Sequence, residues 1–127
     1  MTRVVLDASA VISLLKEERG ATKVAEVVAG AVIGSVSHAE VVGHYVRLGA
    51  PAAEVRTMLD ALPIEVIDVD EALSWDVGAC GAAAVGLSLG DLFCLALARR
   101  LKQPAYTADW TLKEAAAAFG VKVVVVR

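Results

Sequence analysis

The sequence is poor in cysteine and has no long hydrophobic run, and each absence excludes a class of protein. Cys80 and Cys94 form no CxxC motif and have no neighbouring histidine, so we interpret both as buried thiols rather than disulfide or zinc ligands. Hydrophobic residues make up 57% of the chain, yet no run approaches the roughly 18 residues of a membrane span. The N-terminus also lacks the pattern of a signal peptide. We therefore expect a soluble, cytoplasmic protein with no membrane partner.

The chain also lacks an excess of basic residues. Its 15 acidic and 12 basic residues give a formal net charge of −3, which argues against nonspecific adhesion to nucleic acid through a broad basic surface. This balance does not exclude an enzyme that meets phosphates through a metal held by carboxylates. The nucleotide-binding motifs GxGxxG and GxxxxGK[ST] are absent, as are internal repeats and low-complexity linkers. The 127 residues fit a single domain, residues 1–127.

Short apolar segments alternate with helical patterns along the whole chain. Strands are expected at residues 4–7, 31–36, 64–69, 105–107 and 121–126. Helices are expected at residues 8–18, 21–28, 37–48, 51–62, 70–85 and 88–102, and for about ten residues after Asp109. Because parallel strands need crossover connections, this order predicts helices on both faces of a mainly parallel sheet. The predicted fold class is α/β, a three-layer α/β/α sandwich with a five-stranded sheet.

Four acidic residues are expected at one edge of this sheet. Ligands of open parallel sheets bind beyond the carboxyl ends of the strands, where the strand order reverses. Asp7 ends the first strand and Asp109 follows the fourth, while Glu40 and Asp91 lie in the first turns of two helices. Carboxylates that repel one another are tolerated around a divalent cation, and Mg²⁺ or Mn²⁺ prefers such oxygen ligands. A metal held there can activate water for hydrolysis of a phosphodiester.

Each of these carboxylates also has a simpler interpretation as a helix cap. Asp7 and Asp109 can be N-caps, and two pairs, Ser37 with Glu40 and Ser88 with Asp91, have the spacing of a capping box. Two further acids, Asp68 and Asp70, follow the third strand. If that strand lies at the edge of the sheet, they are outside the crevice, and Asp70 is an N-cap.

Two hydroxyl residues lie beside the acidic positions. Ser9 and Thr107 can orient metal ligands or water near Asp7 and Asp109, or they can be ordinary hydroxyls at a helix start and a strand end. His44 shares a helix face with Glu40, so it can approach the substrate or the metal, or lie on a solvated face. His38 and the basic residues Lys16, Arg19, Lys23, Arg99, Arg100 and Lys102 are open to the same two interpretations, phosphate contact or solvated charge.

Four segments together resemble the PIN domain family, and in particular its VapC-type toxins. They are VLDASAVISLL, the helix that carries Glu40, LSLGDLFCLALA and YTADW, and the resemblance extends over essentially the whole chain. It implies a Mg²⁺- or Mn²⁺-dependent endoribonuclease that is held inactive by a cognate antitoxin and is commonly a homodimer. It places the family's four acidic positions at Asp7, Glu40, Asp91 and Asp109, and its hydroxyl at Thr107.

Other functions fit the sequence less well. A haloacid-dehalogenase-type phosphatase needs a second aspartate two residues after the first, where this chain has Ser9. A response-regulator receiver needs an acidic pair at the end of the first strand and a lysine at the end of the fifth. The alternative that remains open is a catalytically inactive PIN-like module that binds RNA or a protein without cutting.

Overall fold

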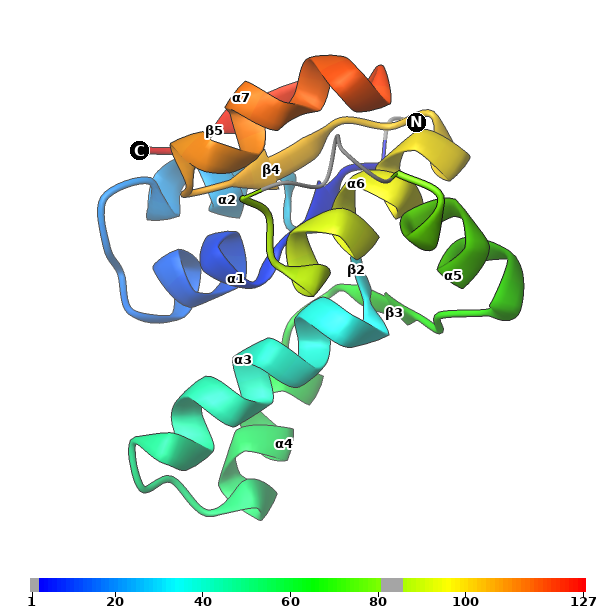
Figure 1. The fold of residues 1–127 in the computed structure, drawn as a ribbon. Helices are drawn as coiled ribbons and strands as arrows, with labels where there is room; N and C mark the ends of the chain where they lie inside the picture. The colour runs from blue at the N-terminus through cyan, green and yellow to red at the C-terminus, as the bar shows by residue number, and fades with distance from the viewer. Residues whose placement is uncertain (1–2, 81–85) are drawn as a thin grey trace.

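A computed structural model of the chain contains a five-stranded sheet with helices on both sides (Figure 1). It describes residues 3–80 and 86–127. The strands are β1 (Val5–Leu6), β2 (Val32–Gly34), β3 (Glu65–Ile67), β4 (Ala105–Thr107) and β5 (Val123–Val125). The helices are α1 (Ala8–Leu15), α2 (Ala21–Val27), α3 (Ser35–Arg47), α4 (Ala52–Asp60), α5 (Glu71–Gly78), α6 (Leu89–Leu101) and α7 (Trp110–Phe119).

The sheet has the strand order β3-β2-β1-β4-β5, and every neighbouring pair is parallel. The chain runs outward from β1 through β2 to β3 and then returns to the other side of β1 to form β4 and β5. The strand order therefore reverses between β1 and β4, and β3 lies at an edge. The predicted α/β fold with a five-stranded parallel sheet is confirmed.

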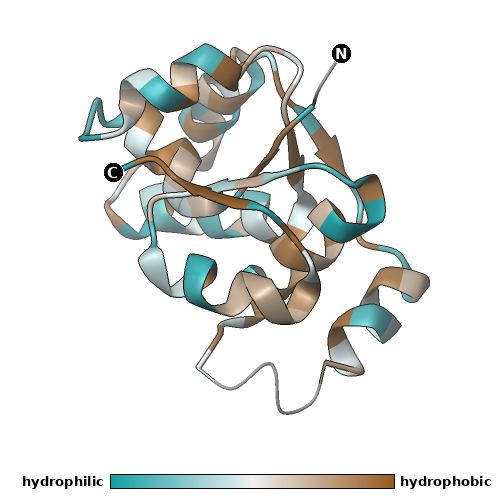
Figure 2. Ribbon diagram, turned by 90° about the horizontal axis from the view of Figure 1, so that it is seen from above, coloured by the Kyte–Doolittle hydropathy of each residue, from teal (hydrophilic) through white to brown (hydrophobic). Residues whose placement is uncertain are grey.

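Alternating side chains along the strands divide the core between the two faces of the sheet. Val5 and Val32 belong to a cluster with apolar residues of α5, α6 and α7, whereas Leu6 and Ile33 pack with residues of α1 to α4. This is the three-layer sandwich that the sequence predicts. Figure 2 shows hydrophobic strands in the middle of the molecule and helices that carry both hydrophobic and hydrophilic residues.

Most of the predicted helix caps are present. Asp7, Asp70 and Asp109 each accept a hydrogen bond from a backbone N–H in the first turn of their helix. Ser88 and Asp91 form the predicted capping box at the start of α6. These bonds satisfy N–H groups that have no partner within the helix.

The capping box predicted for Ser37 and Glu40 is wrong. Helix α3 begins two residues earlier, at Ser35 with Gly34 as N-cap, and Ser37 is buried inside it. The Ser35 hydroxyl, in the first turn of the helix, accepts a hydrogen bond from the backbone N–H of Val69, 3.0 Å away. This contact ties the start of α3 to the segment that follows β3.

Three other details differ from the sequence prediction. Helix α1 ends at Leu15 because the next residues leave the helical conformation, with Glu17 at a φ of 54°. Helix α5 ends at Gly78, and residues 81–85 of the predicted helix lie outside the described residues. Both cysteines are free; Cys94 is buried as predicted, whereas Cys80 is only half-buried.

No helix among the described residues has both the length and the apolar character that crossing a bilayer requires.

Candidate metal centre

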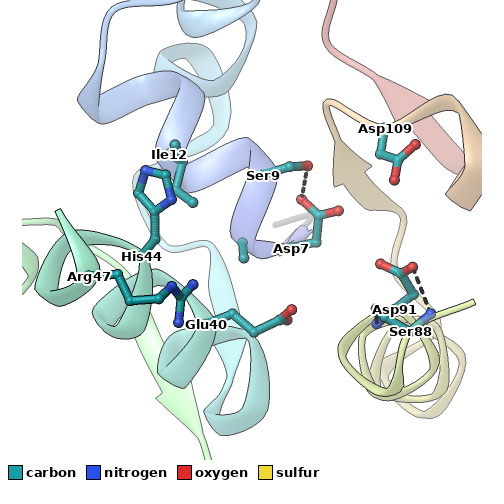
Figure 3. Close-up of a pocket in the computed structure, with 10 residues that line it drawn as sticks. Asp7, Ser9, Ile12, Glu40, His44, Arg47, Ser88, Asp91 and Asp109 are labelled. Atoms are coloured by element: carbon teal, nitrogen blue, oxygen red, sulfur yellow. Dashed lines mark hydrogen bonds between the residues drawn. The ribbon is translucent and has the colours of Figure 1, made fainter.

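The four predicted carboxylates line one cavity of about 400 Å³. Asp7 directly follows β1, Asp109 follows β4, Glu40 projects from α3, and Asp91 lies in the first turn of α6. Figure 3 shows their carboxylate groups pointing toward the same space. The cavity lies beyond the carboxyl ends of β1 and β4, where the strand order reverses, which is where open parallel sheets bind ligands.

Asp7 is the most constrained of the four carboxylates. Its side chain is 5% exposed, and both oxygens accept hydrogen bonds. Oδ1 accepts from the Ser9 hydroxyl at 2.7 Å and from the backbone N–H of Ala10 at 2.9 Å, and Oδ2 accepts from the Thr107 hydroxyl. The two residues that the sequence placed beside the acidic positions therefore hold Asp7 from either side and fix its orientation.

The same two hydroxyls connect Asp7 to the backbone that carries Asp109. The Ser9 hydroxyl accepts from the N–H of Ala108, and the Thr107 hydroxyl accepts from the N–H of Asp109, both at 2.9 Å. The Asp109 side chain in turn accepts from the N–H of Thr111 at 2.9 Å. The ends of β1 and β4 are thus linked by a continuous network, and a role as cap does not exclude a carboxylate from the cavity.

Burial and neighbouring carboxylates raise pKa values in and beside the cavity. Burial raises the pKa of the Asp7 carboxyl, against the lowering effect of its hydrogen bonds. Burial also raises the pKa of Glu40, and the negative charges of Asp91 and Asp7 add to that increase. The buried Cys94 thiol has a pKa well above its usual value because of burial and the same three carboxylates. The three charges therefore act on one another and on their surroundings.

The donor set fits a divalent cation. Four carboxylates offer the hard oxygen ligands that Mg²⁺ and Mn²⁺ prefer, and a cation among them would relieve their repulsion. Within residues 3–80 and 86–127, no three His, Cys, Asp or Glu side chains are close enough together to form a ready-made metal-binding group. The role of the four cavity carboxylates as metal ligands therefore stays a prediction.

Two further side chains of α3 line the cavity on the same wall as Glu40. His44 and Arg47 line the cavity one and two turns after Glu40 (Figure 3). His44 Nε2 is buried and has no hydrogen-bond partner among the described residues. The sequence signal for both was their spacing of four and seven residues from Glu40, which places them on one helix face. Arg47 was not singled out from the sequence as a site residue.

Other residues considered from the sequence lie away from this cavity. His38 lines a separate cavity beside α4. Asp70 follows the edge strand β3, and it pairs with Arg100 at 2.8 Å. The hydrogen bond from Arg100 lowers the pKa of Asp70 to about 2, which fits a structural role. The interpretation of Asp70 as an N-cap is confirmed.

Gly90 allows Glu40 to approach the start of α6. A Cβ atom at Gly90 would overlap the Glu40 carboxylate, although this carboxylate is the end of a flexible side chain and can move aside. Gly90→Ala should therefore fold, with little net change in stability, because Gly90 lies in the first turn of α6 rather than in its middle and Glu40 has to move. It should displace Glu40 and weaken metal binding about 10- to 100-fold, a range typical of changes around ligands. Titration with Mn²⁺ and a thermal melt measure both effects.

Gly78→Ala is the matched control for this substitution. Gly78 lies in α5, and an added Cβ would meet no atom within 4 Å. We expect this variant to gain stability and bind metal like the wild type. Unchanged Mn²⁺ binding in Gly90→Ala would contradict a role of Glu40 in the centre.

Comparison with known proteins finds a matching sequence family and similar folds. The family model described as PIN domain matches residues 4–118. No curated protein matches the sequence significantly. Similar solved structures include a toxin–antitoxin complex from Klebsiella pneumoniae, with 18% identity, a TM-score of 0.75 and coverage of 98% of both chains. They also include VapBC2 from Rickettsia felis bound to a promoter DNA fragment, with 16% identity, a TM-score of 0.73 and coverage of 97% of this chain and 98% of that one. A third is DNA-bound VapBC from Salmonella typhimurium, with 15% identity, a TM-score of 0.74 and full coverage of both chains. At these identities the structures show a shared fold.

Proposed function

The chain belongs to the PIN domain family, and we propose that it is a divalent-metal-dependent endoribonuclease, the toxin of a VapC-type toxin–antitoxin pair. The observation that carries this proposal is the cavity lined by Asp7, Glu40, Asp91 and Asp109 at the reversal of strand order. Phosphodiester hydrolysis at a carboxylate-held metal is the chemistry that such a site supports best.

In the proposed reaction the four carboxylates hold Mg²⁺ or Mn²⁺. When bound, such an ion polarises the scissile phosphate and lowers the pKa of a water molecule. Ser9 and Thr107 keep the Asp7 carboxylate in one orientation by donating hydrogen bonds to its two oxygens. No side chain of the protein is needed as a nucleophile, because a water molecule would attack the phosphorus in line while the P–O bond to the leaving ribose oxygen breaks.

The α3 wall of the cavity is suited to hold the substrate. Arg47 offers guanidinium N–H groups that can donate to phosphate oxygens of RNA. His44 Nε2 is buried in this conformation, so we assign the phosphate contact to Arg47. The position of Arg47 across the cavity from Asp91 and Asp109 would orient the phosphodiester between them.

The proposed partner is a cognate antitoxin, and the proposed assembly is a homodimer. The support for the antitoxin is that similar structures were solved as toxin–antitoxin or VapBC complexes. The homodimer rests only on the resemblance to the family. The antitoxin would be identified by a small open reading frame that lies directly upstream of this gene and encodes a DNA-binding protein. That protein should inhibit RNA cleavage when it is added in equal amount.

Metal removal tests the proposed activity directly. Purified protein should cleave RNA in Mg²⁺ or Mn²⁺, stop when EDTA is added and resume when excess metal is restored. Gel analysis of the fragments measures each state. Cleavage that persists in EDTA would contradict a metal-dependent mechanism. Absence of both cleavage and metal binding would favour the inactive binding module instead.

A further inference from the structure

The carboxylate cavity continues into a second one. This second cavity, of about 530 Å³, shares Ser9, Ile12, His44 and Asp109 with the first and extends to Trp110. Lys16 and Arg127 also line it. A strand bound at the carboxylates therefore has a continuous path toward the start of α7.

Trp110 is an exposed aromatic residue directly after a predicted metal ligand. It is the first residue of α7 and follows Asp109, and 57% of its surface is accessible. Lys113 Nζ lies over its ring, 5.4 Å from the centroid. Exposure alone does not mark Trp110, because Trp75 is exposed as well; what distinguishes Trp110 is that it lines the second cavity directly after Asp109.

The backbone before Trp110 is fixed relative to the carboxylates. Ala108 and Asp109 donate their N–H groups to Ser9 and Thr107, the two residues whose hydroxyls hold Asp7. Asp109 also caps α7. The position of the ring is therefore coupled to the position at which a phosphate would be cut.

The charges around Trp110 suit a nucleic-acid strand. Lys16 and Arg127 line the same cavity, and Arg19 lines a further cavity together with Trp110 and Arg127. Glu18 and Asp109 are the acidic residues that line the second cavity; Glu18 lies 3.9 Å from the half-exposed Arg127, and Asp109 is one of the predicted metal ligands. Proteins bind single-stranded nucleic acid by stacking bases on aromatic rings beside cations that meet the phosphates.

We propose that Trp110 is a stacking platform for an RNA base next to the scissile phosphate, with Lys16 and Arg127 contacting the adjoining backbone. This inference rests on the proposed ribonuclease function and adds a subsite to it. Stacking is tolerant of sequence, so the subsite would position the strand rather than select one base.

Fluorescence can test the stacking without relying on cleavage. The sequence has two tryptophans, and Trp75 is also exposed, at 72%, but lies on α5 and lines none of these cavities. In the double variant Trp75→Phe and Asp91→Asn, Trp110 is the remaining tryptophan and the RNA should stay intact. Titration with a short single-stranded oligoribonucleotide of mixed sequence in Mg²⁺ should quench its fluorescence.

Variants at the ring measure its contribution. Trp110→Ala in the Asp91→Asn background should bind the same RNA about 5- to 100-fold more weakly, as expected for the loss of one stacked base. Trp110→Phe, which keeps an aromatic face, should retain most of the affinity. The matched control, Trp75→Ala, should bind as tightly as its parent. An exposed first helical residue is not needed for folding, and a thermal melt verifies this.

The outcomes separate this inference from the proposed function. A wild-type protein that cleaves no RNA overturns the function. Wild-type cleavage together with unquenched Trp110 and unchanged RNA affinity in Trp110→Ala overturns the subsite alone. An effect of Trp110→Ala confined to binding of a protein partner also overturns it, and would assign the ring to a protein interface.

Discussion

Replacing Asp91 by asparagine is expected to lower RNA cleavage by more than about 100-fold, because changes that merely surround metal ligands already cost up to about that much. The Asp91 carboxylate lines the cavity, and its charge acts on both Asp7 and Glu40. Asparagine keeps the shape of the side chain and can still accept the hydrogen bond that Asp91 takes from the N–H of Ser88. The loss should therefore come from the missing charge rather than from unfolding.

Asp68→Asn is the matched control for this experiment. Asp68 also follows a strand, but that strand is β3 at the edge of the sheet, and its side chain is exposed outside the cavity. Initial rates on one RNA in Mg²⁺, with circular dichroism to verify the fold, compare both variants with the wild type. Equal cleavage by Asp91→Asn and the wild type would point to a contaminating nuclease or to a different site.

Asp7→Asn should stabilise the metal-free protein at neutral pH while abolishing its response to metal. The pKa of Asp7 is raised in the folded protein, so the folded state favours the protonated form. Its favourable contribution is present below the unfolded pKa of about 4 and is lost as the pH rises through the higher folded value. The pKa of Glu40 is also raised in the folded protein, so its contribution to stability is likewise lost as the pH rises. Asparagine carries no charge to desolvate, and its oxygen can accept from Ala10 and Ser9.

Metal binding should reverse this cost in the wild type. A cation present at 100 times its dissociation constant stabilises the folded state by about 2.7 kcal/mol. For a domain of this size, that gain corresponds to a rise in Tm of roughly 10 °C. Asp7→Asn should show little of this rise, because one ligand and its charge are missing.

Thermal melts at a series of pH values, in EDTA and in Mg²⁺, measure both effects. In EDTA the wild type should lose stability relative to Asp7→Asn as the pH rises from about 4 to neutrality. Asp70→Asn serves as a control of opposite sign. The pKa of Asp70 is lowered to about 2, so its contribution is present above the unfolded value and is lost as the pH falls toward 2. Parallel pH profiles for the wild type and Asp7→Asn would show that burial of Asp7 carries no cost.

The sequence predicts the parts of this site that depend on local patterns. Asp7 ends an apolar strand, Asp109 follows another by two residues, and Ser88 and Asp91 have capping-box spacing, so each position is visible within a few residues. Their convergence follows from the general rule for parallel sheets, which requires only that strands and helices alternate. Ser37 is not a cap because α3 already begins at Ser35, where the hydroxyl makes a contact with Val69, 34 residues away, that no local pattern records.

Other features depend on contacts that no local pattern records. Ser9 and Thr107 could be placed beside acidic residues, but the sequence does not show that both donate to the same carboxylate. The raised pKa of Asp7 depends on burial that only the packed structure defines. The continuation of the cavity to Trp110 likewise requires α1, α3 and α7 to be in place.

The hydrogen bond between Thr107 and Asp7 joins residues that are 100 positions apart. A ribosome therefore adds 100 residues after Asp7 before Thr107 exists. Strand β4 then has to pair with β1, on the side opposite the strands made earlier. A partly synthesised chain consequently carries Asp7 and Glu40 before Asp91 and Asp109 have been added, and the cavity that all four line is incomplete until β4 has paired with β1.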